Sequence, residues 1–513
     1  MIAKVRSIVP WLLAVLSLPI LISCSSSEPP MLSRFEETTC KHTLEAGSTT
    51  RCGYLTVPED RNNPDNGKTL KLYVAVYKSL NGDSTQPPLF YLIGGPGAST
   101  ASAYRIFEMS DYYIRKNFGD VRDVIVLDQR GTNYSNPALY CSEELGPLRT
   151  EVYGLTFKDA AASRIRGLVA CYGRLRNEGV NLSAYDSLEN ATDIRDMAII
   201  LGYEKFNLFG ASYGTRLALT TMRHYPQRII SVTLDSILPP EVNPFERAPA
   251  GNVHAFRTFF DAAAARYPAL EEHFYAMMNA LDTAPVDVVG HHYNSAGNPT
   301  DNIAIRVTGD KVASYLVAKL KETPYDTKLP QRIESMFATH AYGPIADSWI
   351  GYLDFFFPNG EAGTDSPSVA MYNSVFSADD AYYTSAEKIR QSIGESFPDA
   401  RDAPIARWHE IHYIDMEPAI LGLWPVAPLP YEESDPVRSD IPTLMLVGTL
   451  DTATPETFIR QPTTDDLPNS FYFPILAGHA TAYLECVDRM MNDFVKNPGT
   501  RPTNSCAAAY TWD

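Results

Sequence analysis

The stretch Gly210-Ala211-Ser212-Tyr213-Gly214 has the residue types and the spacing for covalent chemistry. A G-x-S-x-G turn between a strand and a helix is a nucleophile elbow, in which a strained backbone presents the serine hydroxyl. An apolar run, 206–209, precedes the turn, and a helix-like stretch, 215–224, follows it. The pattern predicts Ser212 as a nucleophile if other parts of the chain supply a base and an acid.

A serine hydroxyl needs a base, and the base needs a carboxylate that orients it. Asp451 follows the strand-like run 442–448, and His479 lies in a glycine-flanked loop after the last such run, 470–475. Loops at the carboxyl edge of a parallel sheet meet in space, and the chain order serine, acid, histidine fits such a site. We predict Ser212 as nucleophile, His479 as general base and then acid, and Asp451 as the residue that orients His479.

Two alternatives concern the acid. Asp235 also follows a strand-like run, 230–235, and competes with Asp451 for the role. Asp451 could instead cap the short helix that begins near Thr454.

The negative charge of an acyl-transfer intermediate needs backbone N–H donors held in place. One expected donor is the N–H of Tyr213, which follows the nucleophile. The other is expected from the loop 94–97, Gly-Gly-Pro-Gly, where we favour the N–H of Gly95. A plain glycine turn is the alternative for that loop.

The apolar runs around these residues predict an α/β fold. Runs 89–93 and 123–127 end at glycine-containing loops, as buried parallel strands do. Runs 52–57 and 70–77 flank a polar turn and predict an antiparallel hairpin. From about 242 to 431 the pattern is mainly helical, with candidate helices over 256–281 and 311–321. We therefore expect a sheet domain over 36–241 and 436–513, interrupted by a helical cap over 242–435 that covers Ser212.

Composition limits the class of protein. The chain has 513 residues, 45% of them hydrophobic, and a formal net charge of −18. A nucleic-acid-binding surface is normally basic, so nucleic acid is not an expected partner. No closely spaced Cys/His cluster predicts a metal, and the chemistry calls for no cofactor.

The N-terminus has the composition of an export signal. Lys4 and Arg6 precede an apolar stretch, 8–22, which is too short for a comfortable membrane span. The following Leu-Ile-Ser-Cys, 21–24, resembles a bacterial lipoprotein signal. That resemblance implies cleavage after residue 23, a lipid on Cys24, a tether over 24–35 and, in a Gram-negative cell, an outer-membrane anchor facing the periplasm. An ordinary secretory signal is the alternative.

The remaining six cysteines suit an oxidising compartment. They fall into local pairs, Cys40 with Cys52, Cys141 with Cys171, and Cys486 with Cys506. Six cysteines allow fifteen pairings, of which this is the most local, and some could be free thiols.

Five motifs together resemble the prolyl and tripeptidyl aminopeptidases of the α/β-hydrolase superfamily, and the tripeptidyl branch more closely. They are Gly-Gly-Pro-Gly (94–97), Asp-Gln-Arg-Gly (128–131), Gly-Ala-Ser-Tyr-Gly-Thr (210–215), Gly-Thr-Leu-Asp (448–451) and Gly-His-Ala (478–480). The resemblance implies a mostly parallel sheet flanked by helices, a large helical cap, and no cofactor. Ile93, Asn133 and Ser377 depart from family patterns, as does the lack of a cysteine before Trp424.

The resemblance also implies a function, a serine exopeptidase that releases one or a few residues from the free N-terminus of short peptides. Such an enzyme must hold the substrate's ammonium, for which Asp379 and Asp380 are candidates. A helix N-cap or a solvated pair is the alternative for these two residues. An esterase or thioesterase with the same triad, and a lipid-anchored binding protein without activity, are the competing functions. The sequence leaves open the oligomeric state and the number of residues released.

Overall fold

The computed structural model describes residues 34–42, 44, 49–80, 84, 86–98, 100, 121–324, 326–360, 364, 366–459, 465–504 and 506. The expected signal over 1–23, Cys24 and most of the expected tether lie outside these residues. Within the described part of the chain, no helix combines the length and the apolar character needed to cross a bilayer.

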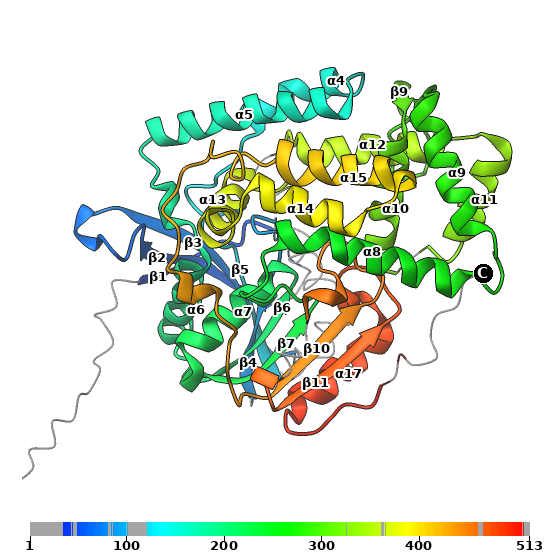
Figure 1. The fold of residues 1–513 in the computed structure, drawn as a ribbon. Coiled ribbons are helices and arrows are strands. Elements are labelled where there is room, and N and C mark those ends of the chain that lie inside the picture. Colours follow the sequence, from blue (N-terminus) through cyan, green and yellow to red (C-terminus); the bar gives the residue numbers. More distant parts are fainter. Residues whose placement is uncertain are drawn as a thin grey trace, which may run out of the picture. The chain divides into compact units, whose positions relative to one another are not determined.

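A nine-stranded sheet organises the described chain, with strand order β1-β2-β3-β5-β4-β6-β7-β10-β11 (Figure 1). The strands are β1 (Arg34–Thr38), β2 (Arg51–Pro58), β3 (Thr69–Tyr77), β4 (Gln86–Leu92), β5 (Arg122–Leu127), β6 (Phe206–Ala211), β7 (Ile229–Asp235), β10 (Thr443–Gly448) and β11 (Ser470–Ile475). The pairs β1–β2, β2–β3 and β3–β5 are antiparallel, and every other pair is parallel. The expected hairpin and the expected parallel strands are therefore confirmed.

Helices cover both faces of the parallel strands. Alternate residues of β4 enter different cores: Phe90 and Leu92 join one buried cluster, and Leu89 and Tyr91 join the other. The helices outside the insertion include α5 (Phe157–Asn177), α6 (Ser187–Ile200), α7 (Tyr213–His224) and α17 (Glu485–Lys496). Burial on both faces explains why these strands are continuous apolar runs rather than alternating ones.

A long insertion separates β7 from β10 and lies to one side of these strands (Figure 1). Its elements are α8 (Pro244–Ala263), α9 (Leu270–Thr283), β8 (Val286–Gly290), β9 (Ile303–Val307), α10 (Gly309–Lys321), α11 (Leu329–Thr339), α12 (Gly343–Phe356), α13 (Val369–Asp379), α14 (Ala386–Ser396) and α15 (Ala403–Glu410). A π-helical turn, Ile411–Asp415, follows α15. We call this insertion the cap.

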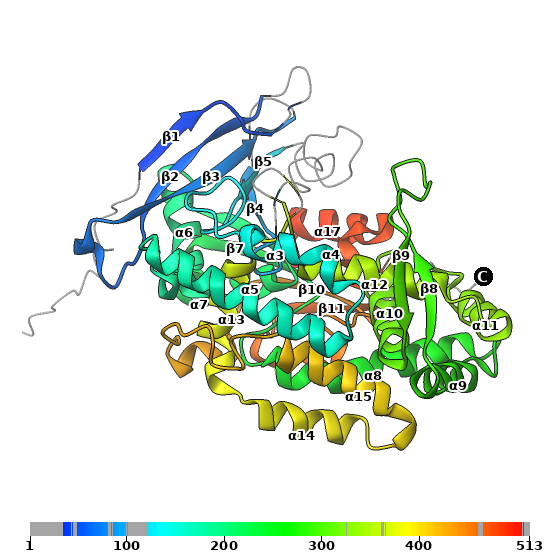
Figure 2. The ribbon, with the colours of Figure 1, turned by 90° about the horizontal axis from the view of Figure 1, so that it is seen from above.

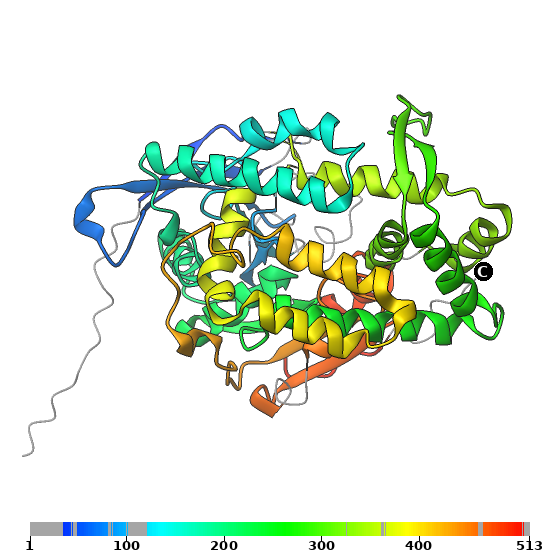
Figure 3. The same cartoon turned by 45° about the horizontal axis from the view of Figure 1, so that its top comes forward.

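The cap differs from the sequence-based prediction in two details. The single helix expected over 256–281 is two helices, because α8 ends at Ala263 and α9 begins only at Leu270. Pro268 lies in the segment between them and disfavours helical backbone at the residue before it. The antiparallel hairpin β8–β9 was not expected. It lies at the end of the cap remote from β1–β3 (Figures 2 and 3).

The N-terminal edge and the disulfides complete the fold. Strand β1 begins at Arg34, two residues inside the expected tether, and pairs with β2 as an edge strand. The disulfides join Cys40 to Cys52, Cys141 to Cys171 and Cys486 to Cys506, which is the most local of the possible pairings.

Candidate active site

Ser212 lies in a strained turn between β6 and α7. Its backbone has φ 58° and ψ −128°, a positive φ that non-glycine residues rarely adopt. The turn also brings α7 against β4, since a Cβ at Gly214 would lie 2.0 Å from the Leu92 carbonyl oxygen. The local geometry is therefore that of a nucleophile elbow.

Asp451 and His479 are hydrogen-bonded to each other. His479 Nδ1 lies 2.8 Å from Asp451 Oδ2, and the Asp451 side chain is fully buried. The other carboxylate oxygen accepts the N–H groups of Ala453 and Thr454 at 2.8 and 3.1 Å. Burial opposes ionisation, but His479 and these N–H donors outweigh it and lower the pKa of Asp451 to about 2. Asp451 is thus a permanent carboxylate that can orient an imidazole.

Asp235, the competing acid, has other partners. Its carboxylate accepts the N–H and hydroxyl of Thr481 at 3.0 and 2.7 Å and the N–H of Ala482 at 2.9 Å. Its backbone carbonyl accepts the N–H of Ser212 at 2.9 Å. Burial raises the pKa of Asp235 to about 6 in spite of these donors. Asp235 therefore connects the nucleophile to the loop that follows His479.

Ser212 and His479 are brought together indirectly. The next residue, Ser236, accepts the N–H of Ala480 at 2.8 Å, so the Asp235–Ser236 pair contacts both the elbow and the histidine loop. Among the described residues, no hydrogen bond joins the Ser212 hydroxyl to His479. Such bonds often shorten only when substrate is bound.

Both expected oxyanion elements lie at the elbow. Tyr213 is the first residue of α7, where a helix leaves its N–H groups without intrahelical partners. In the 94–97 loop, a Cβ at Gly94 would lie 2.6 Å from Ser212 Cβ and 3.1 Å from its hydroxyl. Gly95 has φ 113°, which suits glycine. Gly94, which the Gly-Gly-Pro-Gly pattern alone does not distinguish from its neighbours, has no side chain and so leaves room for the Ser212 side chain. The donor role of Gly95 stays a prediction.

The Asp-Gln-Arg-Gly motif supports the oxyanion loop. The Gln129 side-chain amide donates to the Ile93 carbonyl at 2.9 Å, immediately before Gly94. Asn133, one of the departures noted from the sequence, adopts φ 43° and donates its side-chain amide to Asp128. Asparagine tolerates a positive φ better than most residues, so residue 133 can adopt this conformation without being glycine.

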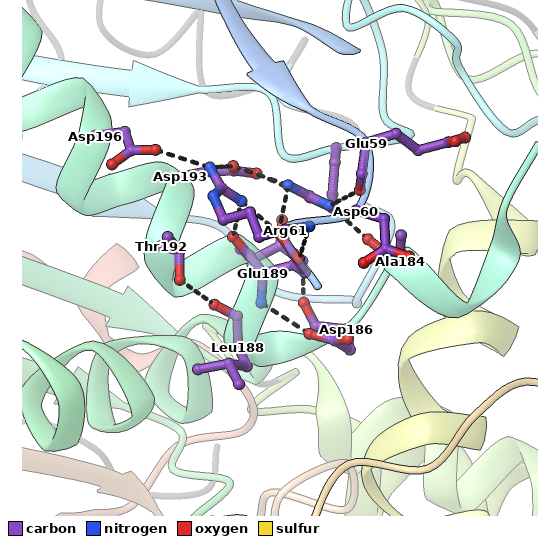
Figure 4. A network of polar contacts seen from close by, with 12 residues as sticks. Glu59, Asp60, Arg61, Ala184, Asp186, Leu188, Glu189, Thr192, Asp193 and Asp196 are labelled. Atoms are coloured by element: carbon purple, nitrogen blue, oxygen red, sulfur yellow. Dashed lines mark hydrogen bonds and ion pairs between the residues drawn. The ribbon is translucent and has the colours of Figure 1, made fainter. Parts of the chain in front are cut away.

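Arg130 of the same motif is fully buried in an ion cluster. It donates to Asp193 at 2.9 Å and to the Ala184 carbonyl at 2.5 Å. In the same cluster Arg61, from the β2–β3 turn, donates to Glu189, Asp193 and Asp196 of α6 (Figure 4). The cluster joins the hairpin, the motif loop and the helix before β6.

The cap contacts the acid and histidine loops directly. The N–H of His479 donates to the Lys321 carbonyl at the end of α10, at 2.8 Å. The Thr452 hydroxyl donates to the Val317 carbonyl of the same helix, also at 2.8 Å. Helix α10 therefore holds both loops of the proposed triad.

Helix α13 of the cap contacts both oxyanion elements. At its start, the Ser368 N–H donates to the Gly97 carbonyl at 2.7 Å, and its hydroxyl donates to the Gly131 carbonyl at 2.6 Å. At its end, Asp380 forms an ion pair with Arg216, which lies one turn after Ser212 in α7.

Asp379 and Asp380 are not a solvated pair, because both are buried at the C-terminal end of α13. Asp380 occupies the N-cap position of the short 3-10 helix Ala381–Tyr383, but its side chain makes no capping hydrogen bond. Asp379 accepts a hydrogen bond from the Ser187 hydroxyl, which lies 2.9 Å from the hydroxyl of Tyr213. Burial raises the pKa of Asp379 to about 8. An ammonium group at this pair would compete with Arg216, and the amine-binding role stays a prediction.

The cap holds a further buried carboxylate, Glu417, which no sequence motif indicated. It is 2% exposed, and its Oε2 atom has no hydrogen-bond partner within the described chain. Tyr372 of α13 donates weakly to the other oxygen at 3.4 Å. Burial raises the pKa of Glu417 to about 7, although Arg164 is near enough to oppose the shift.

These features define the class of protein. Residues 87–485 match the protein family described as "alpha/beta hydrolase fold". The chain therefore belongs to this family of hydrolases.

Among proteins of known function, the chain is 27% identical over 231 residues to serine protease Hip1 of Mycobacterium tuberculosis (strain ATCC 25618 / H37Rv), covering 43% of this chain and 42% of that protein. It is 28% identical over 195 residues to tripeptidyl aminopeptidase of Streptomyces coelicolor, covering 37% and 35%. The matches thus span less than half the length of either relative.

Among solved structures, a thermophilic esterase from Thermogutta terrifontis has a TM-score of 0.35 and 14% identity, covering 87% of this chain and 99% of that one. A Bacillus megaterium epoxide hydrolase has a TM-score of 0.36 and 13% identity, covering 83% and 98%.

Proposed function

We propose that this hydrolase is a serine exopeptidase that releases one or a few residues from the free N-terminus of short peptides. The observation that carries the proposal is the His479–Asp451 hydrogen bond, on loops tied to the Ser212 elbow through Asp235. The partial similarity to a serine protease and to a tripeptidyl aminopeptidase supports peptides as the substrate class.

In the proposed reaction, the Ser212 hydroxyl oxygen attacks the scissile carbonyl while His479 takes the hydroxyl proton. His479 then gives that proton to the leaving amine. Asp451 holds the imidazole in position and stabilises its charged form. The N–H groups of Tyr213 and Gly95 bind the oxyanion. Water then hydrolyses the acyl-enzyme with His479 again as the base.

The test is a comparison of di-, tri- and tetrapeptide p-nitroanilides, each with a free and an N-acetylated amine, alongside p-nitrophenyl esters. An exopeptidase cleaves the free-amine anilides and loses most of its kcat/KM on acetylation. Equal rates with free and acetylated anilides would contradict the proposal and indicate an endopeptidase. Cleavage of the esters alone would indicate an esterase. Ser212→Ala is the control, and it should also abolish labelling by a fluorophosphonate.

We also propose that Cys24 carries a lipid that anchors the protein to the cell envelope. Support comes from the apolar stretch 8–22 and the Leu-Ile-Ser-Cys sequence that ends it. Metabolic labelling with palmitate should mark the natural chain and a Ser26→Ala control but not Cys24→Ser. Labelling of Cys24→Ser would contradict the assignment.

A further inference from the structure

Thr454 contacts the proposed acid with both its backbone and its side chain. It lies in the loop after β10 and is 4% exposed. Its N–H donates to Asp451 Oδ1 at 3.1 Å, and its hydroxyl donates to Asp451 Oδ2 at 2.9 Å. The oxygen of the same hydroxyl lies 3.3 Å from His479 Nδ1. A third polar side chain thus touches both the proposed acid and the proposed base.

The two oxygens of Asp451 have separate partners. Oδ1 accepts the N–H groups of Ala453 and Thr454, so it caps the backbone of the loop that follows. Oδ2 accepts His479 Nδ1 at 2.8 Å and the Thr454 hydroxyl. A carboxylate can accept about four hydrogen bonds, so these donors saturate Asp451. Capping and contact with the imidazole, which the sequence presented as alternatives, are made by different oxygens of one side chain.

The direction of these hydrogen bonds follows from the charge of Asp451. An ionised carboxylate can only accept, so Nδ1 of His479 must carry a proton to bond it. The Thr454 hydroxyl likewise donates to Oδ2, and it turns a lone pair toward the Nδ1 proton. Within the described chain, these two groups are the hydrogen-bond partners of the hydroxyl. The arrangement keeps the imidazole proton on Nδ1, which leaves Nε2 free to act as a base.

A neighbouring hydroxyl shows that burial in this loop does not by itself produce such a contact. Thr452 is 2% exposed, but its hydroxyl donates to the Val317 carbonyl of α10 at 2.8 Å. Thr452 thus fastens the loop to the cap, whereas Thr454 bonds the carboxylate itself. Because Thr454 is buried, water has little access to Oδ2 as a replacement donor, and loss of the hydroxyl would leave the charged oxygen underbonded.

We propose that Thr454 is a positioning residue of the proposed triad. Its hydroxyl holds Asp451 Oδ2 in the orientation that bonds His479 Nδ1, and it keeps the imidazole proton on that nitrogen. This role rests on the proposed function, in which His479 is the base for Ser212. Because the hydroxyl acts through Asp451, its loss should lower kcat and leave KM nearly unchanged.

Three variants test this role with free-amine anilides. Thr454→Val removes the hydroxyl and should lower kcat about tenfold to a hundredfold, as for the loss of a hydrogen bond to a charged group. The rate of fluorophosphonate labelling should fall with it, since Ser212 needs the same base. Thr454→Ser keeps the hydroxyl and should recover most of the loss. Thr452→Val also removes a buried hydroxyl and should lower the urea midpoint comparably, but it should lower kcat much less. Thr454→Ala is a second hydroxyl-free variant in case valine prevents folding.

A double-mutant cycle shows whether Thr454 acts through Asp451. In the Asp451→Ala background the acceptor of the hydroxyl is already gone, so Thr454→Val should lower kcat further by no more than about twofold. Full additivity of the two losses would mean that Thr454 acts by another route, which would overturn the proposal.

A natural kcat in both hydroxyl-free variants would also overturn it. The same holds if Thr454→Ser is as impaired as Thr454→Val, or if Thr452→Val loses as much kcat, since the loop would then need only its fold. In these cases anilide cleavage by the natural enzyme leaves the exopeptidase proposal standing. If the natural enzyme cleaves esters alone, the exopeptidase proposal fails, and ester hydrolysis and fluorophosphonate labelling still measure the effect of Thr454.

Discussion

Two carboxylates compete for the role of acid, and their contacts assign them different work. Asp451 bonds the imidazole of His479, whereas Asp235 bonds the backbone N–H groups of Thr481 and Ala482. In the proposed triad, Asp451 therefore orients the base, and Asp235 fixes the loop that carries the base.

Asparagine substitution should separate these roles. Asp451→Asn keeps the shape but places an amide against His479, so kcat should fall by about 10⁴-fold while the fold persists. Asp235→Asn turns an N–H donor toward a backbone N–H, which should lower the unfolding free energy by about 1–3 kcal/mol. Its loss of kcat should be smaller than that of Asp451→Asn. Urea denaturation and anilide kinetics measure both. A larger kcat loss in Asp235→Asn would reverse the assignment.

Glu417 offers a test of how the substrate amine is held. Its enclosed carboxylate lacks a partner on Oε2, and an ammonium would supply one. Glu417→Gln should raise KM for free-amine peptides by about tenfold to a hundredfold and leave ester hydrolysis nearly unchanged. The same measurements on Asp379→Asn test the candidate that the sequence suggested. An unchanged KM in Glu417→Gln would exclude Glu417.

At the scale of elements, α13 contacts both segments that carry the proposed oxyanion donors, the 94–97 loop and α7. Its start is bonded to Gly97 and Gly131, and its end to Arg216 of α7. A helix held at both ends fixes the spacing of the loops that it joins, so α13 should position the Tyr213 and Gly95 donors.

Substitution at the end of α13 checks this. Asp380→Asn leaves Arg216 buried without its ion-pair partner and should lower kcat about tenfold for every substrate, with little change in KM. Asp379→Asn should be milder, because the raised pKa of Asp379 keeps it largely protonated at neutral pH. A selective rise in KM for free-amine peptides in Asp380→Asn would instead support amine binding by this pair.

The β8–β9 hairpin is fastened by a charged histidine. His292 lies against Asp301 through Nδ1 and against Asp354 of α12 through Nε2, at 2.7 Å from the latter. Both ring nitrogens must donate, which requires the imidazolium form. Burial opposes that form, but the two carboxylates raise the pKa of His292. Arg149 and Tyr153 also bond Asp354.

A raised histidine pKa stabilises the folded state below the unfolded value of about 6.5, and that contribution is lost as pH rises through the folded value. Hydrogen exchange over 286–307, corrected for intrinsic rates, should therefore show protection that falls as the pH rises above about 6.5. His292→Gln should lack that fall. Parallel pH dependence in both proteins would contradict the idea.

The elements near the site were predictable because burial on both faces forces continuous apolar runs, as in β4, β6 and β10. Strand β1 was not, since its Arg-Phe-Glu-Glu-Thr sequence at a sheet edge resembles a polar linker. Hairpin β8–β9 was missed for another reason: its Val- and Ile-rich strands are only five residues each, are mostly at least partly exposed, and lie inside an otherwise helical region. Ser212, His479 and Asp451 could be proposed from local motifs. The contacts of Gln129, Ser368 and Lys321 could not, because they join residues distant in the sequence.

At the scale of the whole molecule, disulfides join segments that are separated in the sequence, and Cys141 and Cys171 lie in the hydrophobic core. The Cys141–Cys171 bridge closes a separation of 30 residues and holds α5, which packs against the 411–415 turn of the cap. The Cys141→Ser/Cys171→Ser double variant should lose about 3–4 kcal/mol of unfolding free energy, by the loop-closure estimate. The midpoint of urea unfolding measures this loss of stability. A reductant should lower the midpoint of the natural protein more than that of the double variant. Equal midpoints without reductant would show that the bridge contributes nothing.

The hydrogen bond from His479 to Lys321 has a consequence for biogenesis. Ser212 is synthesised before the cap, and Asp451 and His479 after it, yet the histidine loop takes its backbone acceptor from a cap helix. We therefore expect the proposed triad to assemble only after the cap has docked, so that hydrolase activity appears late in folding.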